Sequence, residues 1–136
     1  MSAFGNLDRL NSFINNSATI VENAGADIVA PAHKAVMYDV DGNVVIATSG
    51  DKAIGLILSS SPDPIKAGRQ VHFLVKEIGL GEAGGAISKG DFVTVNATGQ
   101  LIKATSGAFI FGRAFTSTTE AGEAVQVQVN PMGYMS

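Results

Sequence analysis

The stretch IATSGDKAIG (46–55) recurs as KATSGAFIFG (103–112), with Ala, Thr, Ser, Gly and the final Gly at the same spacing. The offset between these copies is 57 positions (103 − 46). Further along, the first copy carries three extra residues, and the match resumes at an offset of 54 (121 − 67), where AGRQVHFLV (67–75) faces AGEAVQVQV (121–129). Glycines and apolar positions agree through both segments, so the sequence predicts an internal duplication.

Each copy has the residue pattern of a small β unit. AVMYDV precedes the pair Asp41-Gly42 and NVVIA follows it, which is typical of two strands around a tight turn, because Asp-Gly tolerates a positive φ. Valines alternate with polar residues over 125–129, as in a half-buried strand. We therefore predict an all-β fold, a small β-barrel or sandwich of eight short strands, with copies at about 31–78 and 87–130 inside a domain of residues 31–136.

Two segments lie outside this predicted duplication. Residues 1–30 contain a possible short helix over Leu7–Ile14 and then polar residues, so we expect an extended N-terminal arm that docks on a partner by adding a strand to its sheet. GLGEAG (79–84) fits the letters of a dinucleotide-binding motif, but no helix is expected after it to receive a pyrophosphate. We interpret this stretch as a flexible linker between the copies.

The composition limits the function classes. The chain has 136 residues, a net charge of −3 and basic residues scattered singly, which disfavours binding to nucleic acid. No apolar run reaches the length of a bilayer span and no signal peptide is recognisable, so we expect a protein made in the cytoplasm that does not contact a membrane. Charged residues are only 15%, which predicts that part of the surface is buried against other chains.

The residues that usually carry chemistry are sparse. Cysteine is absent, and the two histidines, His33 and His72, are far apart in the sequence and outside any zinc or nucleophile motif. We therefore expect no catalytic residues, no metal and no cofactor, and we predict that the chain is not an enzyme.

Apolar strands offer candidate contacts between subunits. Phe109, Phe111 and Phe115 lie in FIFGRAF (109–115), and Ile54 and Leu56 lie in the equivalent AIGLIL of the first copy. Aromatic and aliphatic side chains of this kind are enriched where protein subunits meet. The competing interpretation is that they fill the core of the chain itself.

The segment KGDFVTVNATGQLIKATSGAFIFGRAFTSTTEAGEAVQVQV (89–129), with a degenerate copy over 34–75, resembles the capsid decoration, or cement, proteins of tailed bacteriophages. The resemblance implies a small β-rich homotrimer on the outer surface of the expanded phage head, in the virion. Its partner would be the major capsid protein, whose neighbouring subunits it would brace. The first copy has HKAVMYDV (33–40) in place of the Gly-Asp-x-Val of the second, which departs from that pattern.

Two other function classes stay open. An adhesin or fibre-associated module that binds a carbohydrate or a cell surface should display exposed aromatic residues, whereas this chain has no Trp and two Tyr. A small enzyme should bring polar residues into a pocket, and the sequence offers no such cluster.

Overall fold

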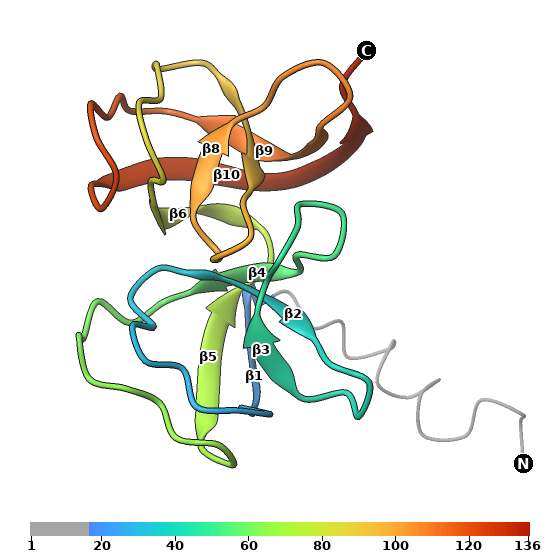
Figure 1. The fold of residues 1–136 in the computed structure, drawn as a ribbon, viewed down its shortest axis with the longest axis vertical. Coiled ribbons are helices and arrows are strands. Elements are labelled where there is room, and N and C mark those ends of the chain that lie inside the picture. The colour runs from blue at the N-terminus through green and yellow to red at the C-terminus, as the bar shows by residue number, and fades with distance from the viewer. Residues whose placement is uncertain (1–16) are drawn as a thin grey trace, which may run out of the picture.

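The computed structural model describes residues 17–136 and shows two five-stranded antiparallel sheets, the lower and upper halves of Figure 1. The first sheet contains β1 (Thr19–Asn23), β2 (Ala35–Tyr38), β3 (Val44–Ile46), β4 (Gly55–Ile57) and β5 (Gln70–Leu74). The second contains β6 (Glu77–Glu82), β7 (Phe92–Val95), β8 (Leu101–Lys103), β9 (Phe109–Ala114) and β10 (Ala124–Tyr134). No helix occurs in this described part, so the predicted all-β class is confirmed; the sheets do not close into barrels.

The two sheets have the same topology. Their strand orders are β1-β5-β4-β2-β3 and β6-β10-β9-β7-β8, so adding five to each strand number converts one order into the other. We call residues 19–74 unit 1 and residues 77–134 unit 2. Every strand of unit 1 thus has an equivalent strand in unit 2, in the same order along the chain.

Backbone hydrogen bonds recur at equivalent positions of the two units. The N–H of Gly25 donates to Val44 at 2.8 Å, and the N–H of Gly84 donates to Leu101 at 2.7 Å. The offset is 59 for the donors (84 − 25) and 57 for the acceptors (101 − 44). An offset of 57 also relates the turn glycines Gly42 and Gly99, whose φ values of 81° and 79° favour glycine. The repeat in the sequence is therefore a repeat in the geometry.

The N-terminal arm predicted over residues 1–30 is not separate from the β body where the structure describes it. Residues 19–23 form β1, which pairs along its length with β5, and Ala24 and Ile28 are buried in the core. Unit 1 accordingly starts near residue 19 rather than at residue 31. Residues 1–16, with the helix expected over Leu7–Ile14, lie outside the described residues.

Most of the Gly-rich stretch 79–84 is a strand rather than a linker. Residues 79–82 lie in β6, which pairs with β10 and starts unit 2 near residue 77 instead of residue 87. A Cβ on Gly79 would meet the side chain of Leu74, and a Cβ on Gly81 would meet that of Leu101. Glycine is used here because other side chains approach the strand closely. β1 and β6 are equivalent, so the same strand is missing from both predicted copies.

Each unit has a small set of buried core residues, and the two sets have equivalent members. The set of unit 1 is a cluster by itself, whereas the set of unit 2 lies in one cluster with other residues of unit 1. In unit 1 the members are Ala24, Ile28, Val36, Val44, Ile57, Val71 and Phe73, and in unit 2 they are Ala83, Ile87, Val93, Leu101, Ala114, Val125 and Val127.

A further apolar layer joins the two units. Residues on β2, β4 and β5 and on the loop before β4 are buried in one cluster with residues of unit 2. At the margin of this layer Lys34 Nζ lies 2.7 Å from Glu82 Oε2, and Gln100 Nε2 donates to the same oxygen at 3.0 Å. The unit 1 side consists of Ala35, Ala47, Ala53, Leu56 and Leu74, and the unit 2 side includes Val95, Phe111 and Val129.

Candidate interaction surfaces

The five predicted contact residues fall into two groups. Phe111 and Leu56 are 0% and 1% exposed and lie in the layer that joins the units, so their side chains are not available to another subunit. Their burial follows from unit 2 packing on the outward face of unit 1, which leaves β4 buried on both sides. Ile54, Phe109 and Phe115 are partly exposed and remain candidates for contacts with a partner.

Within residues 17–136, nothing covers the outer face of the unit 2 sheet. Ile78, Gln128, Arg113 and Phe92 are neighbours in register across β6, β10, β9 and β7. Ile78 is 51% exposed, and the Arg113 guanidinium carbon lies 4.3 Å from the centroid of the Phe92 ring. A shallow hollow of about 130 Å³ adjoins them; its lining residues are Phe92, Arg113, Gln128, Asn130 and Met132.

Apolar side chains continue this face beyond that row. Leu80 is 45% exposed and pairs with Gln126, whose carbonyl accepts a hydrogen bond from the N–H of Phe115. Near the end of the chain the rings of Phe109 and Tyr134 meet edge to face, with centroids 5.3 Å apart. Exposed aromatic and aliphatic groups around an arginine are typical of surfaces that bind another protein.

The equivalent face of unit 1 is covered. Thr19, Leu74, Leu56 and Ala35 occupy the same row across β1, β5, β4 and β2. Leu74, Leu56 and Ala35 are at most 6% exposed because unit 2 packs against them. The same row of the sheet is therefore buried against the other unit in unit 1 and exposed in unit 2.

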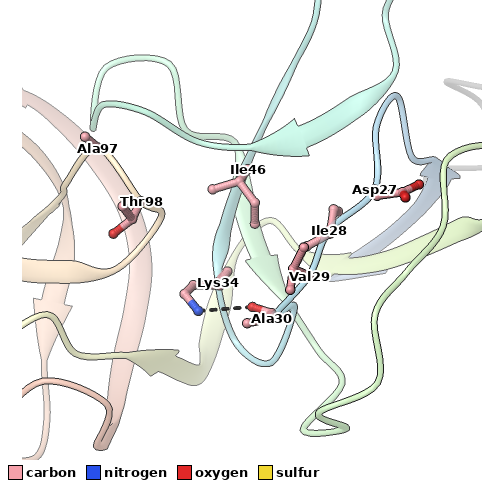
Figure 2. Close-up of a pocket in the computed structure, with 8 residues that line it drawn as sticks. All are labelled: Asp27, Ile28, Val29, Ala30, Lys34, Ile46, Ala97 and Thr98. Carbon is pink, nitrogen blue, oxygen red and sulfur yellow. Dashed lines mark hydrogen bonds between the residues drawn. The ribbon is translucent and has the colours of Figure 1, made fainter.

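A hollow of about 380 Å³ lies where the two units meet (Figure 2). Most of it is walled by unit 1, and Ala97 and Thr98 reach it from the turn between β7 and β8. The Nζ of Lys34 donates to the carbonyl of Ala30 at 3.0 Å and is paired with Glu82, and Asp27 accepts from the N–H of Ala67. The charged groups that line the hollow are thus engaged by other groups of the chain.

Residues 17–136 lack both a metal-binding cluster and a membrane-spanning helix. These residues contain no group of three or more His, Cys, Asp or Glu side chains that could hold a metal ion. The same residues include no helix of the length and hydropathy needed to cross a bilayer.

One tyrosine has a perturbed proton affinity. The hydroxyl of Tyr38 donates to Glu22 Oε1 at 2.6 Å, and this hydrogen bond raises the pKa of Tyr38 to about 12. Both side chains lie on unit 1, at positions equivalent to Val95 and Gly81 of unit 2 (95 − 38 = 57 and 81 − 22 = 59). Tyr38 and Glu22 thus form a hydrogen-bonded pair on the surface of unit 1, whereas the equivalent residues of unit 2 are buried between the units.

Comparison with known proteins shows a structural likeness but no match in sequence. No protein family model and no curated protein sequence matches the chain. Among solved structures, the N base of the head fiber gp8.5 in bacteriophage phi29 superposes with a TM-score of 0.58 at 18% identity, covering 87% of this chain and 97% of that one. The chain therefore has the fold of that base domain.

Proposed function

We propose that this chain is a structural protein of a bacteriophage head, a decoration or cement protein that binds the outer surface of the capsid and braces neighbouring major capsid subunits. The observation that carries the proposal is the match to nearly the full length of a solved head fiber base. The resemblance of residues 89–129 to phage decoration proteins supports the same role. No catalytic step is part of this proposal.

The surface chemistry fits such a role. The outer face of unit 2 exposes Ile78, Leu80 and Met132 beside Arg113, so it combines apolar area with a charge that can fix the orientation of a neighbouring subunit, as assembly of many copies on a head requires. A head presents many copies of one lattice site. A protein that binds the lattice but not dissociated subunits stabilises each site by RT ln(1 + [L]/Kd), which is about 3 kcal/mol when the free protein is at a hundred times Kd.

The test compares heads with and without the protein. We expect heads that lack it to assemble but to release DNA at a lower temperature, and purified protein added back to restore the release temperature. Dissociated major capsid subunits are the control, because the protein should sediment with heads and not with subunits. Equal thermal release from both kinds of head would contradict the decoration role.

A fibre-base or adhesin role is the second candidate, since the similar structure is the base of a head fiber. In that case the chain anchors a segment that binds a cell surface, and its loss should lower adsorption of particles to host cells while leaving the DNA-release temperature unchanged. The two measurements together separate the candidates.

A further inference from the structure

The contact between the two units joins two different surfaces. Unit 1 contributes its outer face, around Ala35, Leu56 and Leu74. Unit 2 contributes the surface that we call its docking surface. Leu74 and Leu56 lie against Gly79 and Gly81 of this surface, and its other members, Val95, Phe111 and Val129, are buried in the same apolar cluster as these leucines. A contact of this head-to-tail kind leaves one unused surface at each end of the pair, because each unit uses only one of its two surfaces.

The unused surfaces belong to opposite ends of the chain. One is the outer face of unit 2, with Phe92, Arg113 and Gln128. The other is the part of unit 1 equivalent to the docking surface. Its members are Ile20, Glu22, Tyr38, Ile54 and Val75, which lie at offsets of 59 (79 − 20, 81 − 22), 57 (95 − 38, 111 − 54) and 54 (129 − 75) from those of unit 2. All five are partly or largely exposed.

Residue differences between these surfaces are complementary. In the internal contact the side chain of Leu56 lies 3.7 Å from where a Cβ on Gly81 would be. The equivalent of Leu56 in unit 2 is Arg113, at offset 57 (113 − 56), and the equivalent of Gly81 in unit 1 is Glu22. Extending the internal contact to a second molecule would therefore set a cation opposite a carboxylate where the chain has an apolar contact internally.

A second position of the same contact changes in a compatible way. Leu74 packs against Gly79 inside the chain. The equivalents are Gln128 and Ile20, so an amide with an aliphatic stem meets an aliphatic side chain. No pair of like charges arises at either position.

We propose that a second copy of this chain binds the outer face of unit 2 through its Glu22 and Tyr38 surface, head to tail, with Arg113 of one copy paired with Glu22 of the next. The arrangement follows that of the internal contact, with the two surfaces set further apart where Ile20 and Glu22 stand in place of Gly79 and Gly81, and each copy extends the series of units by two. Repeated contacts of this kind close into a ring when the rotation permits; a ring of three chains is the homotrimer expected from the resemblance to decoration proteins. The inference does not require a role on a phage head.

Cross-linking between two cysteine variants tests the contact directly, because the natural chain has no cysteine. Arg113→Cys and Glu22→Cys proteins are purified reduced, mixed, and oxidised mildly. We expect a disulfide-linked product from the mixture and none from either variant alone, since the contact joins two different surfaces. Cross-linking of either variant with itself to the same extent would overturn the head-to-tail arrangement.

Charge reversal measured by sedimentation and native mass spectrometry gives a second test. We expect Arg113→Glu and Glu22→Arg each to raise the dissociation constant at least about tenfold, and the double variant to restore association to within about threefold. Lys66→Glu is the control, because Lys66 is exposed, its contact with Asp27 is 3.7 Å long and it belongs to neither surface. Thermal melts of each variant show whether the fold is intact.

Two results would overturn the proposal. One is association of the natural chain that both single reversals leave unchanged. The other is a natural chain that stays monomeric, in which case loss of hydrogen-exchange protection around Glu22 after deletion of residues 2–16 would assign this surface to that segment.

Discussion

Unit 1 and unit 2 share a fold, yet the same row of their sheets lies in opposite environments. Leu56 and Leu74 of unit 1 are buried against unit 2, whereas Arg113 and Gln128 at the equivalent positions face solvent. The end units of repeat proteins generally carry a polar outer surface for solubility. Position in the series, rather than the fold of the unit, therefore decides which residue occupies the row.

The glycines of the two units show the opposite case, in which the fold itself decides. A Cβ on Gly55 would collide with the carbonyl of Leu74, and a Cβ on Gly112 would collide with the carbonyl of Gln128, at offsets of 57 (112 − 55) and 54 (128 − 74). Because this requirement comes from the strand pairing inside each unit, glycine is kept in both copies. Differences between the copies, as at Leu56 and Arg113, thus indicate which surfaces are in contact, whereas identical residues, as at Gly55 and Gly112, indicate what the fold of each unit requires.

The largest expected effect comes from exchanging residues in the row. Leu56→Arg should lower the free energy of unfolding by about 4 kcal/mol or more, because a charge would be buried without a partner. The reverse exchange, Arg113→Leu, should change it by no more than about 1 kcal/mol, since it removes an exposed charge and its contact with Phe92. Urea unfolding of both variants checks this. Losses of equal size would show that the two rows are not in different environments.

Substitution of the strand glycine shared by the two copies should destabilise the protein equally in either unit. Gly55→Ala and Gly112→Ala should each lower the free energy of unfolding by about 2 kcal/mol or more, because the backbone must shift to make room for the methyl group. Gly85→Ala is the matched control: no atom lies within 4 Å of the added Cβ, and the loss should stay within about 0.5 kcal/mol. Costs for Gly55 and Gly112 that differ by more than about 1 kcal/mol would contradict their equivalence.

The repeated part of the fold could be predicted because its signals are local. Asp41-Gly42 marks a hairpin turn, and alternating valines mark β10, so most of the strands and the duplication follow from the sequence. β1 and β6 have no such signal. In β6, Gly79 and Gly81 interrupt the apolar alternation, and both strands are held by pairing with distant strands, β1 with β5 and β6 with β10. A comparison of AGADI (24–28) with AGGAI (83–87), which follow these two strands, could have revealed them.

The interaction surface could be predicted only in part. FIFGRAF and AIGLIL show which segments are apolar but not which residues are buried, because burial of Leu56 and Phe111 depends on how unit 2 lies on unit 1. The signal that points to the surface is a difference between equivalent positions: unit 1 has Leu56 where unit 2 has Arg113. A search for apolar side chains does not detect this difference. Leu80 was missed because it lies in the stretch interpreted as a flexible linker (79–84), and Ile78 directly precedes that stretch.

The contact between the units can be weakened at its margin. Lys34 and Glu82 are 12% and 23% exposed, so removing one partner leaves the other charge partly buried. Glu82→Ala should lower the free energy of unfolding by about 2 kcal/mol, whereas Lys34→Met combined with Glu82→Leu should recover most of it. The exposed pair Lys66 and Asp27 provides the control, and Lys66→Ala should cost no more than about 0.5 kcal/mol. A loss for Glu82→Ala as small as that of the control would show that this ion pair does not hold the units together.

The smallest effect concerns the end of the series that unit 2 does not cover. The Tyr38 hydroxyl donates to Glu22, and a phenolate could not, so the hydrogen bond raises the pKa of Tyr38 from 10.0 to about 12. A raised pKa means that the stabilisation is fully present below pH 10 and is lost as the pH rises through about 12.

Tyr134→Phe leaves Tyr38 as the sole tyrosine of the chain, so absorbance at alkaline pH then reports this group alone. Glu22→Gln in that background should move the midpoint back toward 10, because the charge that opposes ionisation is gone. A midpoint near 10 before that substitution, in a chain still folded by circular dichroism, would mean that Glu22 and Tyr38 are not paired on this surface.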